Sequence, residues 1–592
     1  MKAAKPLLRP RLSPNVSHPA TNGQSGNGKM TRGEKMPRTM PMGKFLFDYL
    51  YAMGVKHSFG VPGDFALPTF AWLDKSPIQH ITMTHEPGAG FAADAYARVN
   101  GIGLVCVTYC VGGLNALNSI AGAYAEKSPV VVVSGAPGRK DREKDPLLHH
   151  KVKTFETQRR VYDEVTVAST VLLDEQTAAA EIMRVVDACL KQKRPVYIEM
   201  PHDMVDREIP IPAQSGIVTA KESDAATLSA ALEEARGFLA GCKKPVIFAG
   251  VELHRHNLME PVLRFAEALN IPIAADLLSK SVVAENHPLY LGVYGGAMSS
   301  DNACRDYVES ADAVLMLGTF ITDMSMGIYT AKLDRQRVIL ATTEQVRIKY
   351  HTYQDIQFAD FLEGLTGLAA KKALKPFKFK AKSKPETPKP LEAAELTKPL
   401  TMTELLRIVA LHLNENCCVV SDVGDAIFGA VGIRTSKRAE FIAPAYYLSM
   451  GFAVPASIGV SMAAPNLRPV VLVGDGAFQM TGTEISTAVR MGLKPIIIIL
   501  NNDGYGTMRK IRDGRFNNIT RWNYGKICEL VGGECRATVA ETIGQLDGAI
   551  QAAMGSECVQ VIDAHLPRDD MSPQLKNMTT EMARLRGAKP AK

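Results

Sequence analysis

The chain has 592 residues, with 68 Lys and Arg against 61 Asp and Glu, so its formal net charge is +7. That length suffices for about three to five domains, each with its own core. A composition of 46% hydrophobic and 22% charged residues excludes a disordered or fibrous protein. No apolar run reaches the ~20 residues of a membrane span, so we expect no membrane partner.

The positive charge is concentrated in two segments. Residues 1–40 carry a net +7 and residues 371–400 a net +6, which leaves −6 over the rest of the chain. A nucleic-acid-binding protein presents its basic residues on a folded face or helix. Both basic segments have a composition typical of unfolded chain, so we expect no nucleic-acid partner.

Residues 1–40 are rich in Pro, Gly, Asn and Ser and show no apolar periodicity, which predicts a disordered basic extension. A near-absence of acidic residues is compatible with a transit peptide, although the Gly/Asn-rich middle favours a flexible extension. The ten cysteines are scattered without a CxxC pair. They predict buried, small apolar groups in a reducing compartment, and hence a cytoplasmic protein.

From residue 41 the pattern alternates between helices and short apolar strands. A helix is expected over 45–54, then strands at 57–61 and 104–110, a helix ending at 125, and strands at 130–135 and 196–201. Continuous Val/Ile runs between helices indicate a parallel sheet covered on both faces. These elements define a first domain over residues 41–215.

Two more α/β domains follow the first. The second (216–370) has expected strands at 245–250, 272–277, 313–318 and 338–343, and the Lys/Pro-rich residues 371–400 read as a linker. The third (401–566) has expected strands at 418–424, 469–476 and 495–502, followed by a C-terminal tail (567–592). The predicted fold is therefore three doubly wound parallel-sheet α/β domains.

The strongest motif lies at two strand ends of the third domain. Gly474, Asp475 and Gly476 end one strand, and Asn502 and Gly504 follow the next. Open parallel sheets bind ligands at this edge, glycines allow a phosphate to approach, and a helix amino terminus attracts anions. The Asp475 carboxylate, the Asn502 amide and the Gly504 carbonyl offer the oxygen ligands that Mg²⁺ prefers.

This arrangement resembles the diphosphate-binding motif of thiamine-diphosphate enzymes, and the resemblance covers residues 41–566. It implies a pyrimidine-binding domain, a middle domain and a diphosphate-binding domain. Within this superfamily the chain is similar to pyruvate, indolepyruvate and phenylpyruvate decarboxylases. The matching stretches are VPGDFALP (61–68), THEPGAGFAADAYAR (84–98), VGGLNALNSIAGAYAEKSPVVVVSGAP (111–137) and LLHH (147–150).

The resemblance implies roles for individual residues. Glu86 would be the acid that activates the cofactor, which acts as an electron sink. Asp64, His149 and His150 would donate and accept protons, because imidazoles titrate near neutral pH.

Other residues would bind the cofactor. Met450 would support its bent conformation, and the remaining predicted contacts are Gly424, Asp425, Gly474, Asp475, Gly476, Ala477 and Asn502. Ile427 takes the place of a larger aromatic residue in pyruvate-specific enzymes, which suggests a wider pocket for aromatic 2-oxo acids.

One segment departs from the family pattern. Pyruvate decarboxylases place a glutamate after the metal loop, where this chain has Met508 or Arg509 in a GTMR segment like that of acetolactate synthases. The predicted function is non-oxidative decarboxylation of an aromatic 2-oxo acid to an aldehyde and CO₂ with Mg²⁺ and thiamine diphosphate. The alternative is carboligation of the acetolactate-synthase type. The resemblance also implies a homodimer or homotetramer with active sites at the subunit interface.

Overall fold

The computed structural model describes residues 38–212, 222–380, 388–434 and 439–585. It divides into two compact units, of which unit 1 comprises Met1–Tyr124 with Ser128–Val218 and unit 2 comprises Ala125–Lys127 with Thr219–Lys592. The predicted disordered extension lies outside the described residues except for residues 38–40, of which Thr39 and Met40 belong to a strand. Part of the predicted linker, residues 381–387, also lies outside them.

Unit 1 is built on a six-stranded, wholly parallel sheet with the order β3-β2-β4-β5-β7-β6. Its strands are β2 (His57–Val61), β3 (Gln79–Thr82), β4 (Gly103–Val107), β5 (Val130–Ala136), β6 (Ser169–Val171) and β7 (Val196–Pro201). Its helices are α1 (Met42–Ala52), α2 (Leu67–Lys75), α3 (Glu86–Asn100), α4 (Val111–Ala125), α5 (Arg139–Lys144), α6 (Thr157–Asp163) and α7 (Ala178–Gln192). A separate antiparallel pair joins β1 (Thr39–Pro41) to β8 (Glu208–Pro210).

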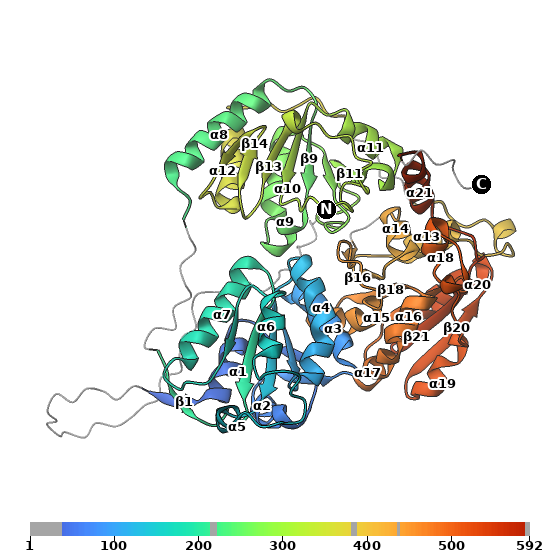
Figure 1. Cartoon of the computed structure of the whole chain (residues 1–592). Coiled ribbons are helices and arrows are strands. Elements are labelled where there is room, and N and C mark those ends of the chain that lie inside the picture. The colour runs from blue at the N-terminus through green and yellow to red at the C-terminus, as the bar shows by residue number, and fades with distance from the viewer. Residues whose placement is uncertain (1–37, 213–221, 381–387, 435–438, 586–592) are drawn as a thin grey trace, which may run out of the picture. The chain divides into compact units, whose positions relative to one another are not determined.

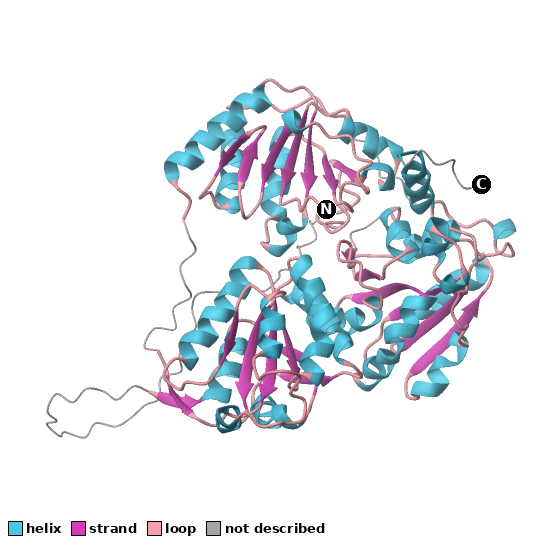
Figure 2. Cartoon of the chain, in the orientation of Figure 1, coloured by secondary structure: helices cyan, strands magenta, loops and turns pink. Residues whose placement is uncertain are grey.

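The centre of this sheet is buried from end to end. Every residue of β4, β5 and β7 is buried, as expected where helices cover both faces of a parallel sheet (Figure 2). The prediction from the Val/Ile runs is confirmed: β2 and β7 have the predicted bounds, and β4 and β5 differ from theirs by one to three residues.

Unit 2 contains two sheets, one of seven strands and one of six (Figure 1). The middle sheet has the order β11-β10-β9-β12-β13-β14-β15, with strands β9 (Pro245–Ala249), β10 (Ile273–Ala275), β11 (Tyr290–Val293), β12 (Ala313–Leu317), β13 (Val338–Ala341), β14 (Val346–Ile348) and β15 (His351–Tyr353). The C-terminal sheet is wholly parallel, with the order β17-β16-β18-β19-β21-β20. Its strands are β16 (Cys417–Ser421), β17 (Glu440–Ile442), β18 (Arg468–Gly474), β19 (Ile496–Asn501), β20 (Cys535–Ala540) and β21 (Val559–His565).

Helices flank both of these sheets. Those of the middle region are α8 (Ala225–Ala240), α9 (Val251–Arg255), α10 (Met259–Leu269), α11 (Asn302–Glu309) and α12 (Phe358–Ala370). Those of the C-terminal region are α13 (Met402–His412), α14 (Asp425–Val431), α15 (Ala453–Ala463), α16 (Asp475–Thr481), α17 (Ile485–Arg490), α18 (Gly506–Ile511), α19 (Ile527–Val531), α20 (Ile543–Met554) and α21 (Pro573–Leu585). The last helix lies in the predicted C-terminal tail and contacts α14.

Two features differ from the sequence predictions. The middle sheet is not wholly parallel, because β14 and β15 add an antiparallel meander to its edge. The prediction that the cysteines are buried apolar groups is wrong for one pair, since Cys528 and Cys535 form a disulfide across the loop between α19 and β20. Among the other eight, Cys242 is half-buried and the rest are buried. Among the described helices, none is long and apolar enough to cross a membrane.

Candidate active site

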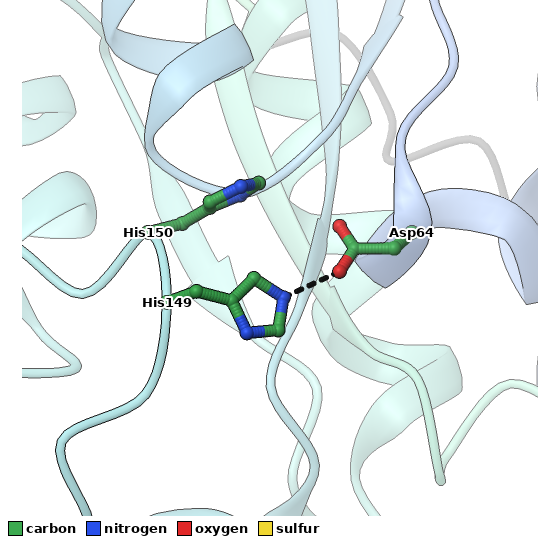
Figure 3. Close-up of side chains that lie close together, drawn as sticks. All are labelled: Asp64, His149 and His150. Carbon is green, nitrogen blue, oxygen red and sulfur yellow. Dashed lines mark hydrogen bonds and ion pairs between the residues drawn. The ribbon is translucent and has the colours of Figure 1, made fainter.

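Asp64, His149 and His150 come together in unit 1 (Figure 3). Asp64 begins a short 3-10 helix after β2, and the histidines follow α5 in the segment beyond β5. The Nε2 atom of His149 lies 2.5 Å from Oδ2 of Asp64. Both side chains are about half exposed, so their polar atoms are accessible to a small molecule.

Phe65 fixes the orientation of both imidazoles. Its ring stacks on His149 at a centroid distance of 4.7 Å and meets His150 edge to face at 5.9 Å. Phe65 itself belongs to a small hydrophobic cluster with Tyr109 and Phe155, and the Tyr109 hydroxyl donates a hydrogen bond to the Phe155 carbonyl. The histidine segment therefore lies on a packed apolar base that fixes its side chains.

The electrostatics of this cluster suit proton transfer. Partial burial raises the pKa of the Asp64 carboxyl, but the hydrogen bond with His149 and the nearby imidazoles outweigh it and lower the pKa below its ordinary value. Asp64 is thus held ionised beside His149. The Nδ1 atom of His150 is buried and has no hydrogen-bond partner among the described residues, so it is free to meet a bound molecule.

Glu86 is the first residue of α3, beyond the carboxyl end of β3. Asn115 on α4 donates a hydrogen bond to its Oε2 atom at 2.7 Å. Gly112 on the same helix has no side chain, and a Cβ at this position would lie 3.4 Å from the other carboxylate oxygen, Oε1. The glycine therefore leaves space beside that oxygen. Asn115 is a contact that the sequence did not reveal, because it lies 29 residues from Glu86.

In unit 2 the GDG motif lies where predicted, at the junction of β18 and α16. Asp475 is almost fully buried, and burial raises the pKa of its carboxyl to about 6. Its Oδ1 atom accepts a hydrogen bond from the Gly476 amide at 2.7 Å, and its Oδ2 from the Gly504 amide at 2.9 Å. The contact between Gly504 and Asp475 in this structure is therefore made by the backbone N–H of Gly504.

These residues fit a metal ion and a diphosphate. In the described part of the chain, the buried Asp475 carboxylate has no ion pair with a Lys or Arg. The side-chain amide of Asn502 likewise has no hydrogen-bond partner there. A Cβ at Gly474 would meet no atom within 4 Å, which leaves open space beside the backbone. Ala477 is buried in the first turn of α16.

The glycine at position 504 is required by the local backbone. Its φ is +132°, and a Cβ there would overlap the Asn517 carbonyl. Glycine therefore permits the loop that places residue 504 against Asp475.

The predicted contacts at Gly424, Asp425 and Met450 surround the end of β16. Gly424 precedes α14 with φ +89°, and Met450 is half-buried beside Gly451. The Asp425 carboxylate accepts hydrogen bonds from the backbone amide and hydroxyl of Ser572, and burial raises its pKa to about 6. In this structure Asp425 therefore links α14 to the start of α21.

Asp422 is a buried residue that the sequence analysis missed. Its carboxylate accepts hydrogen bonds from the amides of Val423, Gly451 and Ala453, at 2.8, 3.1 and 2.8 Å. These bonds fix the backbone just after Met450 and just before Gly424. An aspartate directly after a buried strand in SDVGD is the signal that could have identified it.

Met508 and Arg509 lie where the chain departs from the family pattern, and one is exposed while the other is buried. Met508 is 47% exposed, whereas Arg509 is buried and donates hydrogen bonds to the carbonyls of Asn502 and Asp503. Arg509 therefore holds the backbone of the predicted metal loop. Ile427 is fully buried in the core of the C-terminal region.

Three models of the thiamine pyrophosphate enzyme family match the chain. The N-terminal TPP binding domain matches residues 40–159, the central domain residues 232–364, and the C-terminal TPP binding domain residues 422–564. Each predicted site residue falls within the N-terminal or C-terminal match.

Relatives that match over nearly their full length indicate the branch of the family to which this chain is similar. An indole-3-pyruvate decarboxylase of Azospirillum brasilense is 34% identical over 93% of this chain and 99% of its own length. A probable pyruvate decarboxylase of Schizosaccharomyces pombe is 33% identical over 91% of this chain and 95% of its own, and pyruvate decarboxylase 4 of Arabidopsis thaliana is 31% identical over 93% and 92%. The chain therefore belongs to the thiamine-diphosphate-dependent 2-oxo acid decarboxylases.

Proposed function

We propose that the enzyme uses Mg²⁺ and thiamine diphosphate to convert an aromatic 2-oxo acid to an aldehyde and CO₂. The observation that carries this proposal is the cluster of Asp64, His149 and His150, whose proton-bearing atoms lie together, with Asp64 and His149 about half exposed. When bound, thiamine diphosphate would supply a nucleophilic carbon and accept the electron pair that stays behind when CO₂ leaves.

The residues of unit 1 handle protons in this reaction. Glu86 would bind the pyrimidine ring of the cofactor, while Asn115 keeps the carboxylate in place. The Nε2 atom of His149 lies against the Asp64 carboxylate, which would orient the ring for proton transfer. His150 offers Nδ1 as a second donor or acceptor, so that one site can both receive and return a proton.

The residues of unit 2 bind the charged end of the cofactor. Asp475, Asn502 and the Gly504 carbonyl would hold Mg²⁺, and the amides at the start of α16, in residues 474–477, would receive the diphosphate oxygens. Arg509 keeps the metal loop in place, which gives a positioning role to a residue at the family departure. Gly424, Asp425 and Met450 complete the proposed cofactor contacts.

Two observations favour an aromatic substrate. Ile427 is smaller than the aromatic residue that pyruvate-specific enzymes have there, which supports a wider pocket. The relative from Azospirillum brasilense is named for decarboxylation of indole-3-pyruvate. We also propose a homodimer or homotetramer in which two subunits share each active site, and a cytoplasmic location.

A substrate panel tests the proposal. Purified enzyme with Mg²⁺ and thiamine diphosphate is assayed with pyruvate, a branched-chain 2-oxo acid, phenylpyruvate and indolepyruvate, and both CO₂ and organic products are measured. We expect the highest kcat/KM with an aromatic substrate and one aldehyde per CO₂. A higher kcat/KM for pyruvate would contradict the aromatic preference, and a hydroxyketone as the main product would favour carboligation.

The substitution Glu86→Gln separates chemistry from binding. It removes the acid but keeps the shape of the side chain, so we expect turnover to fall by at least about a hundredfold. Stabilisation by Mg²⁺ and thiamine diphosphate in a thermal-shift assay should remain, because the diphosphate site is unchanged. Full activity in this variant would contradict the role of Glu86.

A further inference from the structure

A cavity of about 740 Å³ lies in unit 2 at the amino-terminal ends of β9 and β11. Its volume is within the range of sites for small molecules. None of the residues proposed above for catalysis or cofactor binding belongs to its wall.

The wall of this cavity is strongly basic. Its only acidic residue is Glu285, which is ion-paired with Lys280. Within the described part of the chain, the ammonium groups of Lys243, Lys378 and Lys380 have no ion-pair partner. The cationic residues of the wall are Lys243, Lys244, Lys378, Lys380 and Arg434, of which Arg434 is ion-paired with Asp301. Clustering the three unpaired lysines is unfavourable unless an anion joins them.

Specific hydrogen bonds hold the backbone of this wall. Asp312 accepts bonds from the amides of Lys243 and Lys244 at 2.7 and 2.8 Å. Asn270 donates to the carbonyls of Phe377 and Phe379 at 2.9 and 3.0 Å, which positions Lys378 between them. The start of the Lys-rich segment is therefore part of the wall, with a fixed backbone.

The same wall offers an aromatic surface. Tyr307 and Phe379 meet edge to face at a centroid distance of 5.6 Å, and the Lys244 ammonium lies 4.4 Å from the centre of the Tyr307 ring. Tyr290 also belongs to the wall, and its buried hydroxyl has no hydrogen-bond partner among the described residues. A group bound in the cavity would supply the missing partner.

We propose that this cavity binds a phosphorylated small molecule that carries a planar ring. The phosphate lies among the lysine ammonium groups, which suit its double charge, and the ring packs against Tyr307 and Phe379. The Tyr290 hydroxyl bonds to a polar atom of the ligand. This site is independent of the proposed decarboxylation chemistry.

Binding is measured by calorimetry on the full chain saturated with Mg²⁺ and thiamine diphosphate, so that the diphosphate site is filled. The probes are AMP and phenyl phosphate, with inorganic phosphate lacking the ring and adenosine lacking the phosphate. We expect AMP or phenyl phosphate to bind at least about tenfold more tightly than either partial probe. No binding at millimolar concentration, or equal binding of inorganic phosphate and the ring-bearing probes, would overturn the proposal.

Two triple variants locate the binding. Lys243→Ala, Lys378→Ala and Lys380→Ala together remove three exposed ammonium groups from the cavity, and we expect affinity to fall at least about tenfold. The matched control, Lys371→Ala with Lys372→Ala and Lys375→Ala, removes three exposed lysines of the same segment that do not line the cavity. Equal losses in both variants, or no loss in either, would contradict a site in this cavity.

Discussion

Asp276 shows how one buried side chain can make stability depend on pH. It lies just beyond β10, fully buried, and burial raises the pKa of its carboxyl to about 7. Oδ1 accepts a hydrogen bond from the Ser279 amide, while Oδ2 has no partner in the described residues. Between its ordinary pKa and about 7, the folded state binds a proton that the unfolded state does not, so stability falls as pH rises.

The substitution Asp276→Asn should remove that dependence. We expect the difference in unfolding free energy between pH 5 and pH 8 to shrink, by at most about 3 kcal/mol. Denaturant titrations at the two pH values measure it. The exposed control Asp74→Asn should leave the difference unchanged, and an unaltered slope in Asp276→Asn would contradict the assignment.

At the scale of elements, α18 stabilises the loop that follows β19. The guanidinium of Arg509 reaches back to the carbonyls of Asn502 and Asp503, and also lies 3.4 Å from the Arg568 carbonyl. One helical residue thus fixes a loop whose own backbone makes few other bonds. Loss of a group that orients a metal ligand typically lowers metal affinity by about 10- to 100-fold.

Arg509→Met should therefore weaken metal binding without removing a ligand. We expect the Mg²⁺ concentration for half-maximal activity to rise about tenfold, with kcat at saturating Mg²⁺ less affected. Met508→Ala is the matched control, because that side chain is exposed on the same helix. An equal change in both variants would show that the hydrogen bonds of Arg509 are not the cause.

The sequence predicted the central strands of the sheets better than their edges. Fully buried strands such as β5 and β7 are continuous apolar runs, which the chain displays directly. Edge strands β3 and β20 expose several residues, and β6 and β17 have only three residues each, so they resemble loops. The antiparallel β14 and β15 are equally short.

The candidate site also contains residues that could be placed from the sequence and residues that could not. The glycines and Asp475 lie in a local motif and could be placed from the sequence. The contacts of Asn115 and Asp422 depend on tertiary folding, since Asp422 reaches an amide 31 residues away and Asn115 a carboxylate 29 residues away. Spacing along the chain carries no signal for such pairs.

At the scale of the whole molecule, the proposed active site uses residues of both units. If two subunits share each cofactor, an inactive Glu86→Gln subunit and an inactive Asp475→Asn subunit complement each other. After co-refolding or co-expression, activity should recover to about a quarter of the wild-type value, since about half of the dimers are mixed and each has one intact site. No recovery, with mixed oligomers demonstrated by differential tagging, would indicate that each subunit builds its own site.

The parallel sheets of unit 1 and of the C-terminal region have the same strand order. Numbered within each sheet, both run second, first, third, fourth, sixth, fifth. Asp64, Glu86 and the histidines follow the first, second and fourth strands of one copy, and the residues proposed for the diphosphate and Mg²⁺ follow the third and fourth strands of the other. This is the pattern expected when an ancestral domain is duplicated and each copy retains the residues that contact a different part of the ligand. Neither domain alone then provides a complete binding site.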